Sequence, residues 1–342
     1  MPHRGPVVRY ERAGDARVPV IDLSAARTRH TGDDGDLDAL AGAVGDILLD
    51  AGFFYVENHG IADTVVRAVR DQTLAFFALP DREKQEIHIA RSPYHRGYFP
   101  EGEENALGSP VADLKEGFEM ALELPMHDPA VVAGKPFHGP NAWPDALPSF
   151  RPALSQMYDG MRRMCDEISG VLAVALGIGR EFFVDKLDKP LCQMRVVRYP
   201  PQDYVPPAVD HPVSIGSGPH TDYGIVSIIW QMDEPGLEIQ SRRGPWISCP
   251  VIPDTFICQL GDATQIWTND HWRATRHRVV NASGRLRHAL AYFHDPNFDA
   301  ELGPLAAFVT PEAPARYPQT TMGAHVTRGF NGAYAYREWK TA

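Results

Sequence analysis

Basic side chains are scarce relative to acidic ones in this chain, and the deficit narrows the possible functions. The 342 residues hold 33 Lys and Arg against 44 Asp and Glu, a formal net charge of −11 at pH 7. This balance argues against a nucleic-acid or anionic-membrane surface, which needs a basic patch. A long apolar run and a charged-then-apolar leader are also missing, so we expect no membrane helix and no secretion. The sequence therefore predicts a soluble, cytoplasmic protein, monomeric and without nucleic-acid or membrane partners.

Cysteine is also rare, with only Cys165, Cys192, Cys249 and Cys258 in the chain. None of them forms a C-x-x-C pair, so no thiolate metal site or redox motif is indicated. A chain of this size can bury a core large enough to do without disulfides. We expect reduced thiols in the core of an ordinary globular protein, in which 44% of the residues are hydrophobic.

The apolar periodicity changes along the chain and predicts a helical part followed by a β part. Residues 1–17 are polar and are expected to form a flexible arm. Helical spacing dominates residues 18–187, with the strongest stripe at 148–177 and a few strands between the helices. Residues 188–311 hold short β-type runs separated by turn residues, which is typical of a sandwich, barrel or jelly roll. Residues 312–342 contain a Pro-rich link and a short helix, and we expect them to cover the site.

The predicted fold class is therefore α+β with a mainly β core. Further helices are expected at about 37–51 and 62–78, and early strands near 18–23, 53–56 and 116–122. The strands of the β part are expected at about 193–199, 225–231, 236–240, 246–251, 256–260, 277–281 and 287–294.

His220 and Asp222 stand two residues apart in the stretch Pro219-His-Thr-Asp-Tyr-Gly224. Side chains alternate on an extended segment, so both point to one side and can take adjacent positions on a metal. A turn with a surface histidine explains this pair equally well. His277, 55 positions after Asp222 and just before a β edge, supplies a third ligand. Two histidines and one carboxylate form the facial triad of non-haem Fe(II) oxygenases, which leaves the opposite metal face open.

Four other histidines are weaker ligand candidates. His211 lies in a Pro-rich loop, and His271 lies in a polar turn where we expect it to be solvated. His288 and His294 lie on the last main strand, where they are expected to be core or pocket residues. Iron ligation is therefore assigned to His220, Asp222 and His277.

An iron site of this kind needs a second participant to activate O2, and a 2-oxo acid is one option. Its distal carboxylate needs a fixed cation, and the planar guanidinium of Arg pairs with carboxylates through two hydrogen bonds. Arg287 lies ten residues after His277 and enters an apolar strand, where an unpaired charge is costly. By alternation Ala289, Ala291 and Phe293 share its face. Arg195 is a second candidate. It shares a predicted strand with Arg198, and because the two side chains point to opposite faces, we expect one of them, Arg195, to be buried.

Several motifs together resemble the Fe(II)/2-oxoglutarate dioxygenases related to isopenicillin N synthase. The resemblance covers about residues 18–335 and includes His220-x-Asp222, His277, Arg287, Val18-Pro-Val-Ile-Asp-Leu, Gly52-Phe-Phe-Tyr-Val-x-Asn-His-Gly60 and Gly261-Asp262. Within that family the chain is most similar to the bacterial ethylene-forming enzymes. The shared stretches are Gly102-Glu-Glu104, His138-Gly-Pro-x-x-Trp-Pro144, Met194-Arg-Val-Val-Arg-Tyr-Pro-Pro-Gln202, Pro219-His-Thr-Asp-Tyr-Gly224 and Ala291-Tyr-Phe-His-Asp-Pro-Asn-Phe298.

The resemblance implies a double-stranded β-helix, or jelly roll, that carries N-terminal helices. It implies Fe(II) held by His220, Asp222 and His277, and 2-oxoglutarate held at its distal carboxylate by Arg287 with support from Arg195. Family members consume O2 and release succinate and CO2, with ascorbate as a candidate reductant, and hydroxylation is their commonest outcome. We expect a small polar substrate, such as an amino acid, an aminocyclitol or an intermediate of antibiotic biosynthesis.

Two departures from the family pattern concern the pockets. Ala289 stands where the wider family usually has a Ser, so one hydroxyl contact worth about 1 kcal/mol is missing beside the 2-oxoglutarate Arg. Gly332 stands where ethylene-forming enzymes place an Arg that helps to hold their arginine co-substrate. The segment from Ile229 to Trp230 is also bulky. Glu104 and Tyr223 match substrate-pocket positions and are expected to suit a polar or cationic co-substrate.

Three alternatives stay open at the level of sequence. These are ethylene formation from 2-oxoglutarate and arginine, an iron oxidase that uses no 2-oxoglutarate, and a metal-free jelly-roll binding protein. Residues 92–112 and 322–335 are expected to cover the substrate and exclude water, as gating loops do.

Overall fold

The computed structural model describes residues 7–14, 16–27, 35–104, 113–201, 215–242 and 244–337. Residues 1–6 of the expected arm, residues 105–112 of the expected cover, Gln202 and His211 lie outside this part of the chain. All four cysteines are buried and carry free thiols, as predicted.

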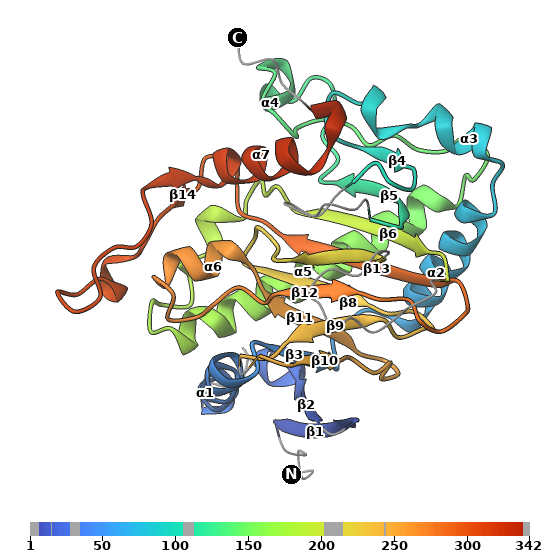
Figure 1. Ribbon diagram of the computed structural model, residues 1–342. Coiled ribbons are helices and arrows are strands. Elements are labelled where there is room, and N and C mark those ends of the chain that lie inside the picture. The colour runs from blue at the N-terminus through green and yellow to red at the C-terminus, as the bar shows by residue number, and fades with distance from the viewer. Residues whose placement is uncertain are drawn as a thin grey trace.

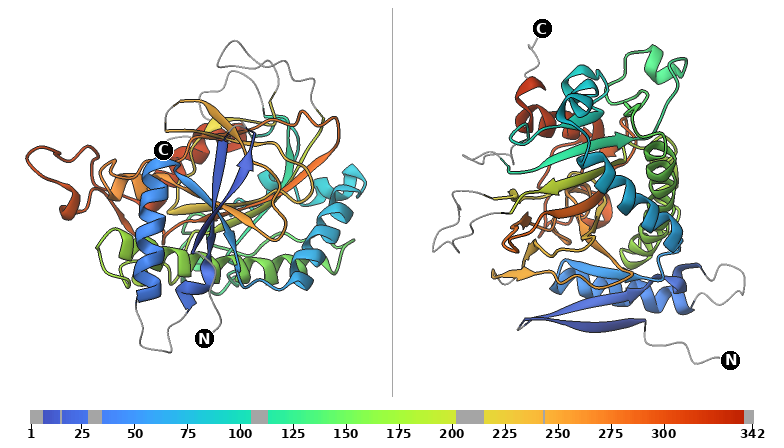
Figure 2. Two further views of the ribbon diagram at one scale, coloured as in Figure 1. Left: turned by 90° about the horizontal axis from the view of Figure 1, so that it is seen from below. Right: turned by 90° about the vertical axis from the view of Figure 1, so that its right-hand side faces the viewer.

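Two facing β-sheets and one helical layer make up the body of the molecule (Figures 1 and 2). Helices α1 (Gly35–Asp50), α2 (Asp63–Phe77) and α5 (Phe150–Ala175) cover one face of the larger sheet. The smaller sheet lies on the other side. The larger sheet has the order β1 (Val8–Ala13), β2 (Ala16–Asp22), β3 (Phe53–Glu57), β11 (Phe256–Leu260), β8 (Val226–Trp230), β13 (Arg287–His294), β6 (Gln193–Tyr199), β5 (Glu116–Ala121) and β4 (Gly97–Phe99).

The smaller sheet has the order β10 (Trp246–Ser248), β9 (Leu237–Gln240), β12 (His277–Val279) and β7 (Ser217–His220). Strands of the larger sheet bury both faces, because successive side chains alternate between two separate cores. On β3, Phe54 packs toward the helices, whereas Phe53 and Tyr55 pack toward the smaller sheet. The space between the two sheets is therefore walled by apolar side chains on both sides.

The N-terminal residues form a hairpin rather than the loose arm that their polar composition predicted. Val8–Ala13 pairs antiparallel with Ala16–Asp22, and the second strand joins β3 in parallel. The arm prediction is therefore wrong for residues 8–13. Cross-strand backbone hydrogen bonds and an ion pair between Arg9 and Glu57 replace the missing apolar pattern at this edge of the sheet.

The C-terminal residues return over the sheets as helix α7 (Met322–Ala333). Figure 1 shows this helix, in red, crossing the end of the molecule that also carries β4 and β5. The contact is close, because a Cβ on Gly329 would lie 2.5 Å from the Tyr223 hydroxyl. An isolated bridge also joins Glu104 to Tyr334 just after the helix.

Short elements complete the described chain. They are α3 (Asp81–Glu86), α4 (Pro129–Val132), α6 (Asp262–Trp267), the paired strands β14 (Glu301–Leu302) and β15 (Thr320–Thr321), and the 3-10 turns Leu23–Arg27, Ile89–Arg91, Val184–Lys186, Ala306–Phe308 and Ala335–Arg337.

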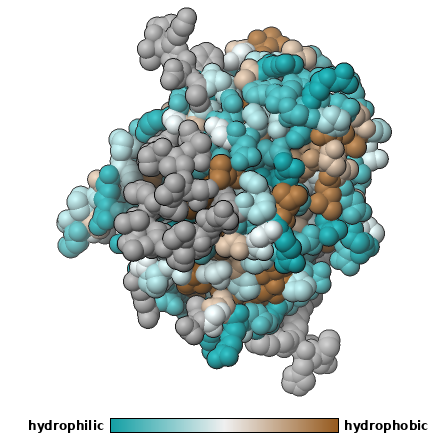
Figure 3. All heavy atoms as spheres, turned by 45° about the vertical axis from the view of Figure 1, so that its right-hand side comes forward, coloured by the Kyte–Doolittle hydropathy of each residue, from teal (hydrophilic) through white to brown (hydrophobic). Residues whose placement is uncertain are grey.

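Hydrophilic side chains dominate the face in Figure 3, and hydrophobic ones form small separate groups there. Among the described residues no helix is long and apolar enough to cross a membrane.

Candidate active site between the two sheets

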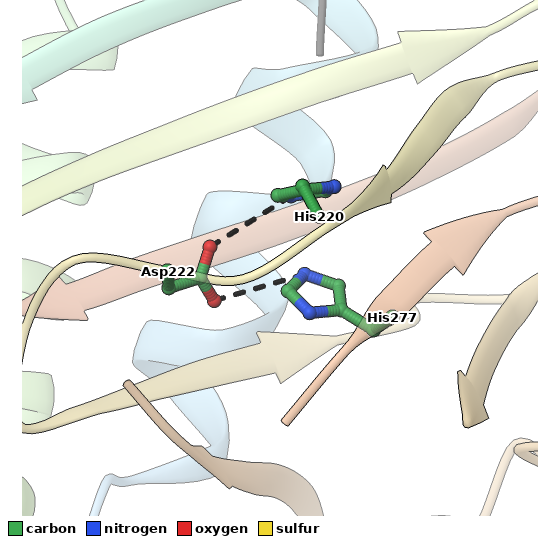
Figure 4. Close-up of side chains that lie close together, drawn as sticks. All are labelled: His220, Asp222 and His277. Carbon is green, nitrogen blue, oxygen red and sulfur yellow. Dashed lines mark ion pairs between the residues drawn. The ribbon is translucent and has the colours of Figure 1, made fainter. Parts of the chain in front are cut away.

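His220, Asp222 and His277 bring three potential metal-ligating atoms within 4.8 Å of one another (Figure 4). The Nε2 atom of His220 lies 3.8 Å from Asp222 Oδ1, and that of His277 lies 3.7 Å from Asp222 Oδ2. His220 ends β7, His277 begins β12, and Asp222 follows in the loop after β7. Among the described residues this is the one group of three His, Cys, Asp or Glu side chains close enough to hold a metal.

Backbone carbonyls set the orientation of both imidazoles. His220 Nδ1 lies 2.7 Å from the Gly218 carbonyl, and His277 Nδ1 lies 3.0 Å from the Thr275 carbonyl. With Nδ1–H donated to these carbonyls, each Nε2 lone pair is left facing the Asp222 carboxylate. Such secondary contacts are the usual way in which proteins fix a ligating histidine. The donor set, two imidazole nitrogens and one carboxylate, therefore fits Fe(II).

The loop that carries Asp222 is held by the start of α6. The backbone N–H of Asp262 donates to the Asp222 carbonyl at 2.7 Å, and that of Ala263 donates to the Tyr223 carbonyl at 3.0 Å. The first backbone N–H groups of a helix have no partner inside the helix, so those of α6 can donate to this loop. A Cβ on Gly261 would lie 2.3 Å from the Gly224 carbonyl oxygen, so the approach requires glycine.

Two side-chain hydrogen bonds also hold the Asp222 carboxylate in place. Gln259 Nε2 donates to Asp222 Oδ2 at 3.0 Å, and the Ser227 hydroxyl donates to the same oxygen. Burial alone would raise the pKa of Asp222, but His277, His220 and these two donors lower it overall. Burial lowers the pKa of His277 to about 4, although the negative charge of Asp222 acts to raise it. The site therefore holds an anionic carboxylate and, at His277, a neutral imidazole, which is the state that binds a metal.

Arg287 lies fully buried at the start of β13, where it was predicted to anchor a carboxylate. Its Nη2 donates to Gln231 Oε1 at 3.2 Å, and its guanidinium carbon lies 4.8 Å from the centroid of the Tyr199 ring. Its Nε and Nη1 atoms make no hydrogen bond within the described residues. Burial lowers the pKa of Arg287. Two buried donors without acceptors are costly, so this geometry favours a bound anion such as a carboxylate.

One small cavity connects Arg287 to the triad. It is lined by Arg287 and Ala289 on β13 and by Leu237 and Val279 across from them, and it reaches His277. Ala291 and Phe293 also line it, as the alternation along β13 predicted. The cavity therefore joins Arg287 to the triad, and the cationic side chains of Lys115 and Arg195 line it as well.

A second small cavity also reaches the triad, at His220 and Asp222. Glu104, Tyr223 and Asp295 line it together with Phe330 of helix α7. Asp295 is buried, and its Oδ1 atom has no hydrogen-bond partner among the described residues. Burial raises the pKa of Asp295 well above its ordinary value, and the nearby Asp222 adds to this.

Arg195 lines both cavities, but it lies away from Arg287. In the register of β6 and β13 it faces Ala291, whereas Arg287 faces Tyr199. Its Nη1 lies 2.9 Å from Glu104 Oε2, and its Nε lies 2.8 Å from Glu119 Oε2. Its guanidinium also lies over the rings of Phe99 and Phe293.

Two predicted pocket residues lie elsewhere. Gly332 is exposed on α7 and lines neither cavity beside the triad. Trp230, part of the bulky segment after the iron motif, lines a separate cavity, and only its neighbour Ile229 reaches the cavity of Arg287. The other histidines stay away from the triad within the described residues: His271 is exposed, and His288 and His294 face the helices.

Sequence reasoning missed several residues that shape the site. Gln231, Gln259 and Ser227 hold Arg287 and Asp222 through side-chain hydrogen bonds, and Asp295 and Phe330 line the second cavity. Gln and Ser carry no pattern of their own, so only the pairing of strands could reveal them. Asp295 follows the strand that carries Arg287, and this position was the one available signal.

Two family descriptions match this chain. Residues 18–146 match the family "non-haem dioxygenase in morphine synthesis N-terminal", and residues 191–296 match the "2OG-Fe(II) oxygenase superfamily". A homoarginine-6-hydroxylase of Glycine max is 32% identical over 318 residues, which cover 91% of this chain and 95% of the relative. A 2-oxoglutarate-dependent dioxygenase of Monascus ruber, citB, is 32% identical over 84% of this chain and 87% of its own length.

Solved structures agree with these matches. An oxygenase of Caulobacter crescentus, described as belonging to the 2OG-Fe(II) family, superposes with a TM-score of 0.78 at 25% identity over 94% of this chain and 99% of its own. A full-length protein of Neurospora crassa, in complex with alpha-KG and thymine, gives a TM-score of 0.76 at 25% identity over 94% of this chain and 98% of its own. The predicted jelly-roll core with helices packed on it is confirmed.

Proposed function

The chain belongs to the 2OG-Fe(II) oxygenase superfamily, and we propose that it hydroxylates a small polar metabolite that carries a cationic group. It is a 2-oxoglutarate-dependent dioxygenase. Fe(II) and 2-oxoglutarate, when bound, supply the oxidising chemistry, in which O2 is consumed and succinate and CO2 are released. The substrate class and the roles of individual residues are the proposal.

His220, Asp222 and His277 are proposed to hold the iron. Their convergence supports this, because all three ligating atoms face one point while backbone carbonyls occupy the remaining Nδ1 atoms. Ser227 and Gln259 donate to Asp222 and thereby fix the carboxylate in its anionic form.

Arg287 is proposed to bind the distal carboxylate of 2-oxoglutarate. The support is its Nε and Nη1 atoms, which have no hydrogen-bond partner among the described residues, and its position in the wall of the cavity that also reaches His277. Gln231 holds the third nitrogen and so fixes the plane of the guanidinium. Ala289 leaves space beside this plane where a hydroxyl would have supplied one more contact.

One observation carries the choice of a cationic substrate: the Asp295 carboxyl group lines the second cavity beside the triad, together with the rings of Tyr223 and Phe330. An ammonium or guanidinium group in this cavity would give the buried carboxyl group a charged hydrogen-bond partner. Tyr223 and Phe330 offer ring faces beside it, which favour the same charge.

Glu104 adds a carboxylate to this wall, although Arg195 and Lys115 already neutralise it. The similarity to homoarginine-6-hydroxylases points in the same direction, because homoarginine is a cationic amino acid. The proposed class therefore includes basic amino acids and aminocyclitols.

Coupled turnover with a matched pair of compounds tests this proposal. We expect arginine or homoarginine to stimulate succinate release and to be hydroxylated, whereas citrulline, in which a neutral ureido group replaces the guanidinium group of arginine, should do neither. Asp295→Asn should weaken the response to the cation, and Asp299→Asn, at an exposed carboxylate four residues away, serves as the control. Equal coupling with citrulline would contradict the proposal.

Ethylene formation is tested in the same reactions. Hydroxylation predicts no ethylene above the vials during turnover with arginine. Ethylene in stoichiometric amounts would instead support an ethylene-forming activity, the alternative that the sequence suggested.

A further inference from the structure

A further cavity lies behind the site, on the far side of Ile229 from the triad. This rear cavity has a volume of about 290 Å³ and contains none of the three triad residues. Trp230 and Phe256, which pack on the helix side of the larger sheet, form its inner wall near Val66 of helix α2, and Tyr55 lines it from the opposite face of that sheet. A pocket of this size, at the small end of the range for ligand sites, suits a molecule with one ring.

The inner wall of the rear cavity is aromatic. The ring of His59 meets that of Phe256 edge-on with centroids 4.5 Å apart, and Trp230 meets the same Phe256 at 6.2 Å. Trp230 is only partly buried, so its ring offers apolar surface that the fold does not use. Rings arranged in this way offer an apolar slot to a flat ligand.

The rim of the rear cavity carries more acid than base. Asp63 and Asp254 are exposed on it, and Arg67 is the one full cation among the residues that line it. Asp254 stands in a left-handed turn, with φ of 55°, directly before Thr255 and Phe256. Two carboxylates and several ring faces together favour a ligand that is both aromatic and positively charged.

Hydrogen bonds connect this cavity to the 2-oxoglutarate side of the active site. The Tyr55 hydroxyl donates to the Pro250 carbonyl at 2.8 Å, and Gln231 Nε2 donates to the same carbonyl at 3.4 Å. Gln231 Oε1 accepts from Arg287 Nη2 at 3.2 Å. Ile229 is shared more directly, because it lines both the rear cavity and the cavity of Arg287.

We propose that the rear cavity is an accessory binding site for a small aromatic cation, and that its occupancy changes the affinity of the enzyme for 2-oxoglutarate. The ligand would place its ring against Trp230 and Phe256 and its charge between Asp63 and Asp254. Any shift of Ile229 or Gln231 on binding then reaches the cavity and the guanidinium of Arg287.

The test uses phenethylamine as the cationic probe and phenylacetate, of similar size, as its anionic counterpart. Calorimetric titration of the anaerobic Fe(II)-loaded protein should show one phenethylamine site and at least tenfold weaker binding of phenylacetate. A saturating concentration of phenethylamine should change the dissociation constant of 2-oxoglutarate by about fivefold or more. Tyr55→Phe should reduce this change while it leaves the ring wall in place.

Variants locate the site. Val66→Trp fills the rear cavity and should abolish phenethylamine binding, whereas Val132→Trp, at a position 74% exposed on α4, should leave it intact. If Val66→Trp does not fold, a double variant replaces it. Asp63→Asn with Asp254→Asn changes only exposed side chains and should weaken phenethylamine binding. Binding that survives these changes but is lost in Asp295→Asn would place the probe in the substrate cavity and overturn the proposal. An unchanged 2-oxoglutarate affinity would overturn the coupling.

Discussion

His277 on β12 lies directly opposite His220 on β7, with ring centroids 4.2 Å apart, although the chain separates the two residues widely. The pairing of two short strands at one edge of the smaller sheet is therefore what assembles the metal site. Asp222 completes it from the loop that α6 holds through two backbone hydrogen bonds. The backbone of the fold therefore sets the positions of the three ligands.

Replacing Arg287 with Gln should raise the KM for 2-oxoglutarate about 10- to 100-fold. Loss of a hydrogen bond to a charged group costs about 1.5–3 kcal/mol, which corresponds to this range. Arg285→Gln is the matched control, since its side chain is 73% exposed and pairs with Glu234 at the surface. The KM is measured from succinate release at a series of 2-oxoglutarate concentrations. An equal rise in KM in both variants would contradict the proposed role of Arg287.

Gly236→Ala should disturb Arg287 without removing its charge. A Cβ at Gly236 would lie 2.9 Å from Arg287 Cδ and 2.8 Å from the Val280 carbonyl oxygen. We expect the KM for 2-oxoglutarate to rise by about tenfold, because strain of this kind costs roughly 1–3 kcal/mol. Gly244→Ala is the control, with φ of +110° and no atom within 4 Å of the added methyl. If both variants behave alike, backbone strain and not displacement of Arg287 is the cause.

Arg195→Met should lower the free energy of unfolding by about 3–5 kcal/mol, the usual cost of leaving buried charges without a partner. Glu119 is fully buried, and Arg195 is the partner that the structure gives it in an ion pair. A second change, Glu119→Gln, removes the stranded carboxyl and should restore part of the loss. Denaturant unfolding of the single and double variants measures this, and a double variant that is less stable than Arg195→Met would contradict the account.

His294 should make the protein less stable as the pH falls. Burial keeps its imidazole neutral and lowers its pKa to about 3, with Arg162 acting in the same direction. The unfolded chain, where the pKa is about 6.5, binds more protons, so stability is present above pH 6.5 and is lost as pH falls toward 3. The slope is up to about 1.4 kcal/mol per pH unit. Unfolding of His294→Gln between about pH 7 and 5 should show a flatter slope, and the same change at exposed His127 is the control.

Much of the site could be predicted because strand alternation and ligand spacing are local properties of the sequence. Arg287, Ala289, Ala291 and Phe293 line one cavity together, as their alternation predicted. His220 and Asp222 likewise point to one place. Such patterns predict which side chains lie together in the folded protein, because the side chains of a strand point to only two faces.

The rest depends on partners that are distant in the chain. Arg195 was expected to support Arg287 and does line the same cavity, so that role stays a prediction, but its ion pairs with Glu119 and Glu104 were not foreseen. Trp230 was expected near the substrate, yet alternation along β8 sets it on the helix side of the larger sheet, where it lines the rear cavity and not the cavity of Arg287. Neither outcome could be read from spacing, because both depend on which strands lie side by side.

The central claim is that His220, Asp222 and His277 bind Fe(II) and that 2-oxoglutarate joins the iron there. Its most direct test is the visible spectrum of the protein with Fe(II) and 2-oxoglutarate in the absence of O2. We predict a weak charge-transfer band for the wild type and for Arg285→Gln, and no band for His220→Ala at the same protein concentration. A wild type without the band, or a band of full strength in His220→Ala, would contradict the account.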